Sequence, residues 1–162
     1  MYMIAAVDSN WALGKDNKLL VSIPEDMKFF RETTAGHVVV MGRKTLESFP
    51  GKKPLKNRTN IVLTSDTNYV VDGADVVNTV DELIAKLEVY ERSDIYVIGG
   101  GSVYRQLLPY ADTCLITKIY KEFDADTYFP DLDADEEWSL TAATEKKTHE
   151  GLEFAFCTYT RK

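Results

Sequence analysis

The sequence predicts an α/β protein with a single, mostly parallel, twisted sheet of about eight strands. Helices are expected on both faces, and an antiparallel C-terminal hairpin is expected at one edge. Two observations predict this class. Short runs rich in Val, Ile, Tyr and Thr alternate with helical patterns, as in parallel sheets whose crossover helices cover both faces. The last two runs are instead joined by a polar segment alone, which favours a hairpin. At 162 residues, the chain is predicted to form one domain over residues 1–162.

Seven runs of four to eight residues have the composition of strands. They are Tyr2–Val7, His37–Met41, Asn60–Thr64, Ala74–Val77, Ile95–Ile98, Thr113–Tyr120 and Glu153–Thr160. An eighth strand is expected near Ser139–Ala143. Only the polar segment Glu145–Glu150 separates it from the last run, so these two strands are predicted to pair antiparallel at an edge.

Two helices carry clear start signals. Pro24 opens a helical pattern that extends to Thr34, and proline is favoured in the first turn of a helix. Thr79 and Glu82 have the spacing of a capping box, and apolar residues at helical spacing follow them. Each helix comes after a predicted strand or a loop that follows one, as strand–helix alternation requires.

Composition excludes several classes of protein. The chain has 19 Lys and Arg against 26 Asp and Glu, a net charge of −7, which argues against nonspecific binding to nucleic acids or anionic membranes. The sequence has no signal-peptide pattern and no apolar run near the roughly 20 residues that span a bilayer, so a cytoplasmic protein is expected. Cys114 and Cys157 lack metal-ligand spacing and are predicted to be buried free thiols, with no metal site.

The segment Asp8–Ile23 joins the first strand to the first helix without a helical period. It is about 16 residues long, and loops beyond about 12–15 residues are usually functional. We interpret it as a lid, with Gly14 as a flexible point. Trp11 lies in this segment, and closure is expected to move its indole into a drier environment.

A glycine-rich junction follows the predicted strand Ile95–Ile98. Gly99, Gly100, Gly101 and Ser102 lead directly into a helical pattern, so the backbone could approach a phosphate closely at a helix N-terminus. The spacing matches neither the standard dinucleotide motif nor the P-loop. A phosphate cradle and a tight structural turn both remain open on the pattern alone.

A second strand–helix junction carries Arg43 and Lys44 at the start of a helical stretch. Cations are unfavourable at a helix N-terminus, and a bound anion would remove that cost. Two such junctions suit the phosphates of a dinucleotide, and the cationic pair suits the 2′-phosphate of NADPH. An exposed charged surface is the alternative. In Gly51–Arg58, four of eight residues are cationic, and the pattern fits either a solvated loop or a further anion site between two strands.

Asp26 is the one acidic residue on an otherwise apolar face of the helix Pro24–Thr34. Helical spacing places it with Phe29, Phe30 and Thr33. A carboxylate among aromatic rings has a raised pKa and can exchange protons near neutral pH. Alternatively, Asp26 only complements the free N–H groups and the dipole of the first turn.

Together these features resemble the dihydrofolate reductase family along almost the whole chain. The motifs that carry the resemblance are Ile23-Pro24-Glu25-Asp26 with Phe30, Met41–Ser48, Arg58–Ile61, Ile98–Tyr104 and Asp126–Pro130. The resemblance implies NADPH-dependent reduction of 7,8-dihydrofolate to 5,6,7,8-tetrahydrofolate, by hydride transfer to C6 with protonation at N5. It also implies a role in one-carbon metabolism and tetrahydrofolate biosynthesis, an antifolate target, and a monomer without nucleic-acid or membrane partners.

The resemblance assigns roles residue by residue. Asp26 corresponds to the acid that binds the pterin 2-amino group and N3 and promotes protonation at N5, and Thr117 to the threonine that hydrogen-bonds this acid. The implied substrate-binding residues are Ile4, Ala5, Asp26, Phe30, Phe49, Leu55, Arg58, Ile98 and Thr117, with Arg58 on the α-carboxylate of the glutamate tail. The implied NADPH-binding residues are Ala6, Leu13, Gly42, Arg43, Lys44, Thr45, Thr64, Ser65, Gly99, Gly100, Gly101, Ser102, Val103, Tyr104 and Asp126. In the family, a cis peptide joins the first two glycines of Gly99–Gly101.

The chain departs from the family at Leu20-Val21, where a Pro-Trp pair is usual. The indole of that pair reaches the pterin through water, and valine has no donor for this bond. A smaller departure is Ala125, where some bacterial members have glycine.

Two other functions are weighed against this resemblance. The reductase of riboflavin biosynthesis shares the fold and NADPH, but it lacks counterparts of Asp26 and Arg58. A nucleotide-binding module without chemistry is the second alternative, and the presence of both Asp26 and Thr117 argues against it.

Overall fold

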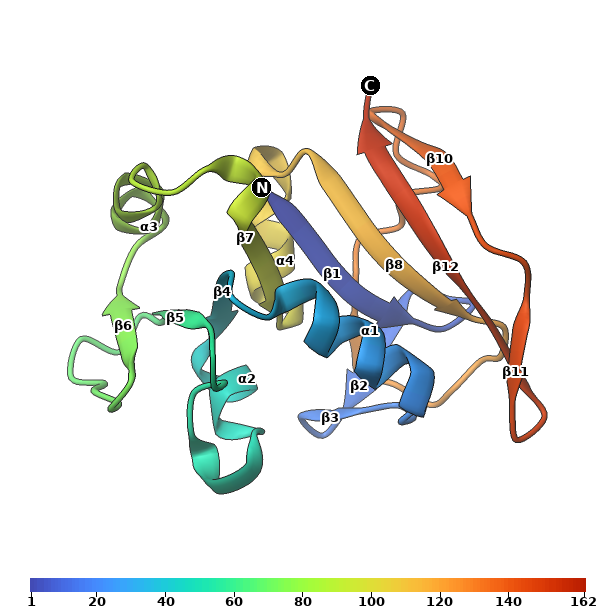
Figure 1. Ribbon diagram of the computed structural model, residues 1–162, viewed down its shortest axis with the longest axis horizontal. Helices are drawn as coiled ribbons and strands as arrows, with labels where there is room; N and C mark the ends of the chain where they lie inside the picture. Colours follow the sequence, from blue (N-terminus) through green and yellow to red (C-terminus); the bar gives the residue numbers. More distant parts are fainter.

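The computed structural model describes residues 1–162. Its main sheet has nine strands, eight of them in the order β10-β12-β8-β1-β7-β4-β5-β6, while β11 pairs with β12 (Figure 1). The strands are β1 (Tyr2–Val7), β4 (Val38–Gly42), β5 (Thr59–Leu63), β6 (Ala74–Val77), β7 (Ile95–Gly99), β8 (Thr113–Ile119), β10 (Trp138–Ala143), β11 (Lys147–His149) and β12 (Leu152–Arg161). The strands from β8 to β6 are parallel, and β12 runs antiparallel to both β8 and β10. The predicted α/β class, with its antiparallel C-terminal edge, is confirmed.

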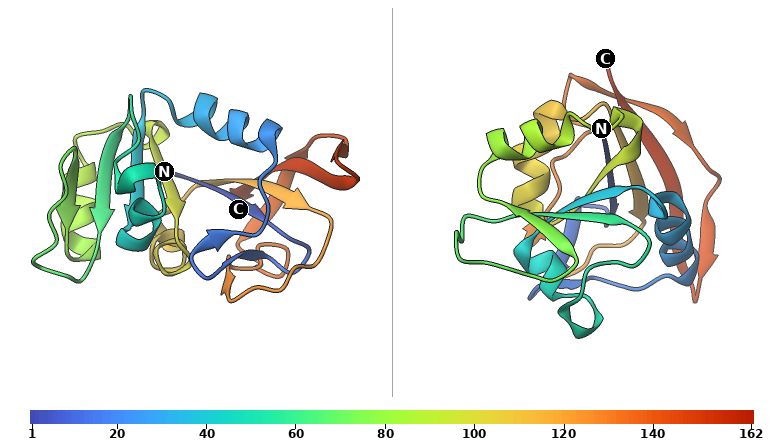
Figure 2. Two further views of the ribbon diagram at one scale, coloured as in Figure 1. Left: turned by 90° about the horizontal axis from the view of Figure 1, so that it is seen from below. Right: turned by 60° about the vertical axis from the view of Figure 1, so that its left-hand side comes forward.

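Helices cover both faces of the sheet. They are α1 (Pro24–Thr34), α2 (Arg43–Glu47), α3 (Val80–Leu87) and α4 (Gly101–Leu107), with short 3₁₀ turns η1 (Pro50–Lys52), η2 (Arg92–Asp94) and η3 (Leu108–Tyr110). In β4, Val38 and Val40 belong to the same core cluster as side chains of α3 and α4, whereas Val39 and Met41 pack with Leu46 of α2. This alternation places α2 on the face opposite α3 and α4. Figure 2 shows α1 and α4 on opposite sides of the sheet.

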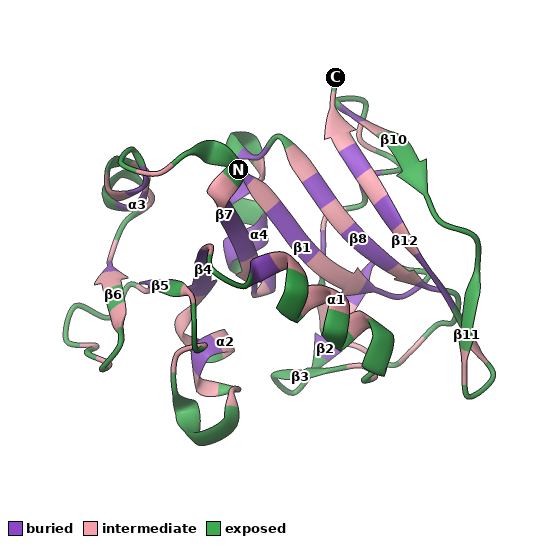
Figure 3. Ribbon diagram, viewed as in Figure 1, coloured by how far each residue is buried: buried purple, intermediate pink, exposed green.

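The core lies along the central strands, which are largely buried in Figure 3, while the outer side of α1 and the edge strands β10 and β11 are exposed. Cys114 and Cys157 are buried free thiols, as predicted. The predicted cap of α3 is also confirmed, because the backbone N–H of Glu82 donates to Thr79 Oγ1 at 3.1 Å. None of the helices combines the length and the apolar character that crossing a membrane would require.

Two segments predicted as irregular contain strands. Asp8–Ile23 holds β2 (Ala12–Lys15) and β3 (Lys18–Leu19), which form a three-stranded antiparallel sheet with β9 (Thr127–Tyr128) in the order β3-β2-β9. The polar segment Glu145–Glu150 likewise contains β11. These strands have two to four residues, too few for a period of two to be detected, and β9 lies far from β2 in sequence. We call β3-β2-β9 the small sheet.

Trp11 anchors the small sheet to the core. It is 6% exposed, stacks on Phe129 with ring centroids 6.1 Å apart, and meets Tyr159 edge-on at 5.6 Å. Lys118 Nζ lies 4.9 Å from the centre of its ring. The expectation that Trp11 becomes shielded only when a lid closes is therefore wrong, because the indole is already part of the core.

Gly14 also differs from its predicted role as a flexible point. It lies within β2, and a Cβ there would be 2.3 Å from the carbonyl oxygen of Lys18. The missing side chain lets β2 and β3 approach each other closely, so Gly14 serves the pairing of these strands.

Candidate active site

A cleft of about 510 Å³ opens between the sheet, α1, α2 and the small sheet. Its walls include the β7–α4 junction, at the carboxyl end of a parallel strand, where α/β proteins commonly bind ligands. Of the predicted site residues, the lining includes Ile4, Ala5, Ala6, Leu13, Asp26, Phe30, Thr45, Phe49, Ile98, Gly99, Gly100, Gly101 and Tyr104. The structure thus brings together predicted residues from five separate parts of the chain.

Other predicted residues lie outside the lining of this cleft. They are Gly42, Arg43, Lys44, Leu55, Arg58, Thr64, Ser65, Ser102, Val103, Thr117 and Asp126. Conversely, sequence reasoning missed Gly14, Lys15, Asn17, Lys18, Leu19, Met27, Ser48, Pro50 and Thr127, which do line it. The first five fall inside the segment predicted as a lid, so the length of that segment was the available signal. Leu19 and Met27 are apolar side chains that are 65% and 37% exposed. No periodicity in the sequence distinguishes them as site residues.

Asp26 forms the floor of the cleft, and Thr117 is buried directly behind it, outside the lining. Thr117, on β8, is 2% exposed, and its Oγ1 donates a hydrogen bond of 2.6 Å to Asp26 Oδ1. Burial raises the pKa of Asp26, while the hydrogen bond from Thr117 opposes the rise. The carboxylate makes no hydrogen bond to the N-terminus of α1, and its Oδ2 has no protein partner. Of the two interpretations, the geometry therefore favours a protonatable group that is free to bind a ligand.

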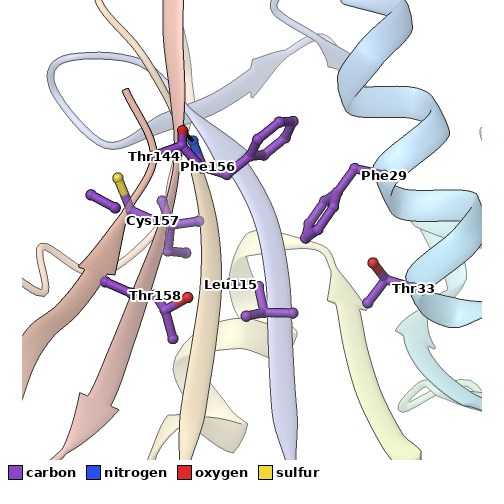
Figure 4. A pocket seen from close by; sticks show the side chains of 10 residues that line it. Phe29, Thr33, Leu115, Thr144, Phe156, Cys157 and Thr158 are labelled. Carbon is purple, nitrogen blue, oxygen red and sulfur yellow. Dashed lines mark hydrogen bonds between the residues drawn. The ribbon is translucent and has the colours of Figure 1, made fainter. Parts of the chain in front are cut away.

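The apolar face of α1 is divided between two hollows. Asp26 and Phe30 line the cleft, whereas Phe29 and Thr33 line a separate groove of about 390 Å³ between α1 and the strands β8 and β12. In Figure 4, the rings of Phe29 and Phe156 point toward one another in this groove, with centroids 4.7 Å apart. The residues of the predicted common face therefore line two different hollows, although β8 contributes residues to the surroundings of both.

The β7–α4 junction leaves little room for side chains. A Cβ on Gly101 would lie 2.7 Å from Thr127 Cγ2, and a Cβ on Gly99 or Gly100 would lie 3.3 Å from Thr45 Oγ1. A cis peptide bond joins Gly99 and Gly100. These contacts give the glycines a structural role, and their backbone also forms a wall of the cleft. Both interpretations of the junction are therefore compatible with the structure.

Tyr104 ties α4 to β1 inside the same wall. Its Oη donates a hydrogen bond of 2.6 Å to the carbonyl oxygen of Ile4, and the side chain is fully buried. Burial raises the pKa of the phenol, so the hydroxyl remains a donor at neutral pH.

Arg43 and Lys44 differ in their surroundings. Arg43 Nε lies 3.7 Å from Glu47 Oε1, and Arg43 Nη1 lies 3.8 Å from Asp66 Oδ2. The Lys44 side chain is exposed, and its carbonyl oxygen accepts a bond of 3.1 Å from Asn17 Nδ2, which links the small sheet to α2. The charge pattern alone suggested two cations without partners, but Arg43 already lies beside two carboxylates.

Arg58 is held beside the C-terminal turn of α1 without a carboxylate partner. Its Nε donates to Thr34 Oγ1 at 3.1 Å, and its Nη1 and Nη2 donate to the carbonyl oxygens of Lys56 and Arg31 at 2.9 and 3.4 Å. Burial and the positive charge of Arg31 lower the pKa of Arg58. Thr34 lies one helical turn beyond the cleft-lining Phe30. Arg58 is thus a fixed cation with unused N–H donors, suited to an anionic group.

Carboxylates also hold the small sheet in place. The backbone N–H of Asp16 donates to Asp126 Oδ2 at 3.0 Å, and the N–H of Asp126 donates to the carbonyl oxygen of Gly14 at 3.1 Å. An ion pair joins Lys15 to Asp124. Asp126 therefore positions a wall of the cleft without lining it.

A parallel sheet, a cleft with a side-chain-free strand–helix junction on one wall, and a half-buried protonatable carboxylate on its floor define a nucleotide-dependent α/β enzyme. The family model described as dihydrofolate reductase matches residues 1–161, and the chain belongs to this family. The resemblance noted in the sequence is confirmed, and the two alternative functions are rejected.

Individual relatives agree with this assignment. A dihydrofolate reductase of Bacillus subtilis strain 168 is 37% identical over 161 residues, which cover 98% of this chain and 93% of the relative. One from Haloferax volcanii is 36% identical and covers 99% and 82%. Among solved structures, a dihydrofolate reductase from Enterococcus faecalis complexed with NADP(H) has a TM-score of 0.88 and 36% identity, covering 99% of this chain and 95% of that one.

Proposed function

We propose that this chain reduces 7,8-dihydrofolate to 5,6,7,8-tetrahydrofolate with NADPH, and that Asp26 and Thr117 support the proton transfer. The single observation that carries the assignment of these residues is the 2.6 Å hydrogen bond from the buried Thr117 to Asp26, which lines the cleft. A raised pKa keeps Asp26 able to exchange protons closer to neutral pH than an ordinary carboxyl.

Asp26 binds and orients the pterin ring. Thr117 uses one lone pair of Oδ1, so Oδ2 and the second lone pair of Oδ1 are left to accept hydrogen bonds from the 2-amino group and N3–H of the pterin. The neighbouring Phe30 and Phe49 supply apolar walls for a flat ring. Fixing the ring in this way aligns N5 for protonation, while the apolar walls exclude water from the carboxylate.

NADPH fits the opposite wall. The junction Gly99–Gly101 is a cradle that a Cβ would fill, which suits close approach of a pyrophosphate, and Thr45 lies beside it. Arg43, Lys44, Thr64 and Ser65 would hold the adenosine half and its 2′-phosphate. When bound there, NADPH supplies the hydride for the reduction.

Arg58 binds the glutamate tail of the substrate. Its side chain is fixed one helical turn beyond Phe30, and no carboxylate of the protein competes for it. Leu55 would contact the substrate between the cleft and Arg58. Its backbone N–H donates to Asn60 Oδ1 at 3.0 Å, which fixes the chain just before β5.

Loss of absorbance by NADPH, with and without dihydrofolate, tests the proposal. Wild-type protein is expected to oxidise NADPH only when dihydrofolate is present, and Asp26→Asn is expected to lose most of this activity at pH 7. Glu25→Gln is the matched control, because Glu25 is an exposed acid on the same helix, paired with Lys147 at 3.5 Å. Folded protein that binds NADPH but never oxidises it would contradict the proposal.

The protein is further proposed to act as a cytoplasmic monomer with one domain spanning residues 1–162. A complete cleft within one chain supports the monomer, and two free thiols support a reducing compartment. Light scattering during size-exclusion chromatography measures the oligomeric state, and a dimer mass would contradict the monomer.

A further inference from the structure

Arg43 lies in a cluster of charges at the β4–α2 junction. Its guanidinium is 3.7 Å from Glu47 and 3.8 Å from Asp66, and the three side chains are 41%, 33% and 43% exposed. Both distances are longer than hydrogen bonds, so the donors of Arg43 remain available to a ligand. Partial exposure makes each ion pair weak, so a stronger anion can compete for Arg43.

Asp66 is held in this cluster by its own turn. Its backbone N–H donates to Thr64 Oγ1 at 3.2 Å, and its Oδ1 accepts from the N–H of Asn68 at 2.9 Å. The other carboxylate oxygen, Oδ2, is the one nearest Arg43. The turn therefore fixes a negative charge next to the cation, directly after Thr64 and Ser65.

The charges of Arg43 and Glu47 both reach Tyr69, which places them in the same small region of the surface. The Arg43 guanidinium lies 5.9 Å from the centre of the Tyr69 ring. Burial raises the pKa of the Tyr69 phenol, the Glu47 charge adds to the rise, and Arg43 opposes it. A ligand group that reaches Arg43 therefore meets the negative field of Glu47 as well as that of Asp66.

We infer that Asp66 and Glu47 set how strongly this enzyme distinguishes NADPH from NADH. The inference rests on the proposed function, which places the adenosine half of the cofactor at Arg43, Thr64 and Ser65. The two cofactors differ only at the adenosine ribose, which carries a 2′-phosphate in NADPH and a 2′-hydroxyl in NADH. An arginine favours the phosphate, whereas a carboxylate repels the phosphate and accepts a hydrogen bond from the hydroxyl.

The site therefore contains both cations that favour the 2′-phosphate and carboxylates that favour the 2′-hydroxyl. Arg43 and Lys44 select NADPH, while Asp66 and Glu47 reduce that selectivity and keep NADH usable. Neutralising either carboxylate should increase the ratio of kcat/KM for NADPH over kcat/KM for NADH. A rise of about three- to tenfold is expected for each, the effect of one half-exposed charge at this distance.

The test compares this ratio at saturating dihydrofolate in wild type, Asp66→Asn, Glu47→Gln and the double variant. Asparagine keeps the Oδ1 acceptor for Asn68, so the turn is retained. Asp72→Asn is the matched control, because Asp72 is an exposed acid in the same β5–β6 connection and forms no ion pair. Calorimetric titration with adenosine 2′,5′-bisphosphate and with adenosine 5′-monophosphate provides a readout that does not depend on turnover.

The expected result is a higher ratio and tighter binding of the bisphosphate in Asp66→Asn and Glu47→Gln, with Asp72→Asn like wild type. An equal rise in Asp72→Asn would assign the effect to net charge and overturn the inference. Arg43→Ala tests the placement of the cofactor separately from the role of Asp66 and Glu47. If Arg43→Ala lowers the ratio while Asp66→Asn and Glu47→Gln leave it unchanged, the inference fails and the cofactor placement stands. If Arg43→Ala has no effect, the placement itself fails.

Discussion

The floor of the cleft and its periphery differ in the sign and the surroundings of their charged side chains. On the floor, Asp26 is a single half-buried carboxylate whose partner is the neutral hydroxyl of Thr117. On the periphery, Arg43, Lys44 and Arg58 are cations in partial contact with water. Burial on the floor raises the pKa of Asp26. The charges on the periphery are instead screened by the water around them.

The two regions also differ in what holds their side chains in position. Thr117 lies on β8, which pairs with β1 on one side and β12 on the other, so its position depends on the centre of the sheet. Arg58 depends on one hydroxyl and two carbonyl oxygens at the end of α1. Changes on the floor should therefore affect the chemical step, and changes on the periphery should mainly affect binding. Four predictions test this division, from the largest effect to the smallest.

Asp26→Asn should reduce kcat at pH 7 by about 10²–10⁴-fold, the usual contribution of a positioned acid or base. The loss should shrink as pH falls, because solvent acid can then protonate N5 in place of the missing group. A pH profile of kcat for wild type, Asp26→Asn and the control Glu25→Gln measures this. A loss that stays constant across pH would mean that Asp26 only positions the pterin.

Arg58→Ala should raise KM for dihydrofolate far more than it lowers kcat. A charged hydrogen bond is worth roughly 1.5–3 kcal/mol, which corresponds to about a 10- to 150-fold change in KM. Steady-state kinetics with dihydrofolate varied at saturating NADPH measures both constants. Lys53→Ala serves as a control, since Lys53 is an exposed cation in the same segment. An unchanged KM would remove Arg58 from the site.

Thr117→Val should raise the pKa of Asp26 further, because the hydrogen bond from Thr117 is what opposes the effect of burial. The pH above which kcat/KM falls should therefore move upward, because Asp26 promotes protonation of N5. Loss of the hydrogen bond that orients Asp26 should separately lower kcat/KM by about tenfold or less. Thr117→Ser retains the hydroxyl and should restore the wild-type profile. If serine and valine give the same profile, the hydroxyl has no role in the protonation of Asp26.

Asp26→Asn should also stabilise the fold slightly at neutral pH. The pKa of Asp26 is raised in the folded state, so ionisation destabilises the protein as pH rises through that pKa. The variant should have a higher Tm than wild type at pH 7. The difference should vanish once the pH falls below about 3.9, the ordinary value for aspartate. Calorimetric Tm values across this range measure it, and a variant less stable than wild type at pH 7 would contradict the desolvation of Asp26.

Much of the fold follows from local patterns in the sequence. The bounds of α1, β1 and β6 match the predicted ranges residue for residue, and Thr79 caps α3 as expected. These features depend on neighbours within a few positions, through side-chain alternation, proline at a helix start and capping spacing. The placement of Asp26 on an inward face of its helix was predictable for the same reason.

Only the tertiary structure decided which distant residues meet. Thr117 reaches Asp26 across 91 positions because β8 lies next to β1 in the sheet, an order that no local pattern encodes. Asp66 and Arg43 approach each other through the parallel pairing of β4 with β5. The small sheet and the burial of Trp11 likewise depend on contacts with residues near position 128 and beyond. By itself, the sequence determined the elements and the residue types available for chemistry, because periodicity and capping are short-range. Their arrangement around the cleft required strand order and side-chain packing, which depend on the free energy of the whole folded chain.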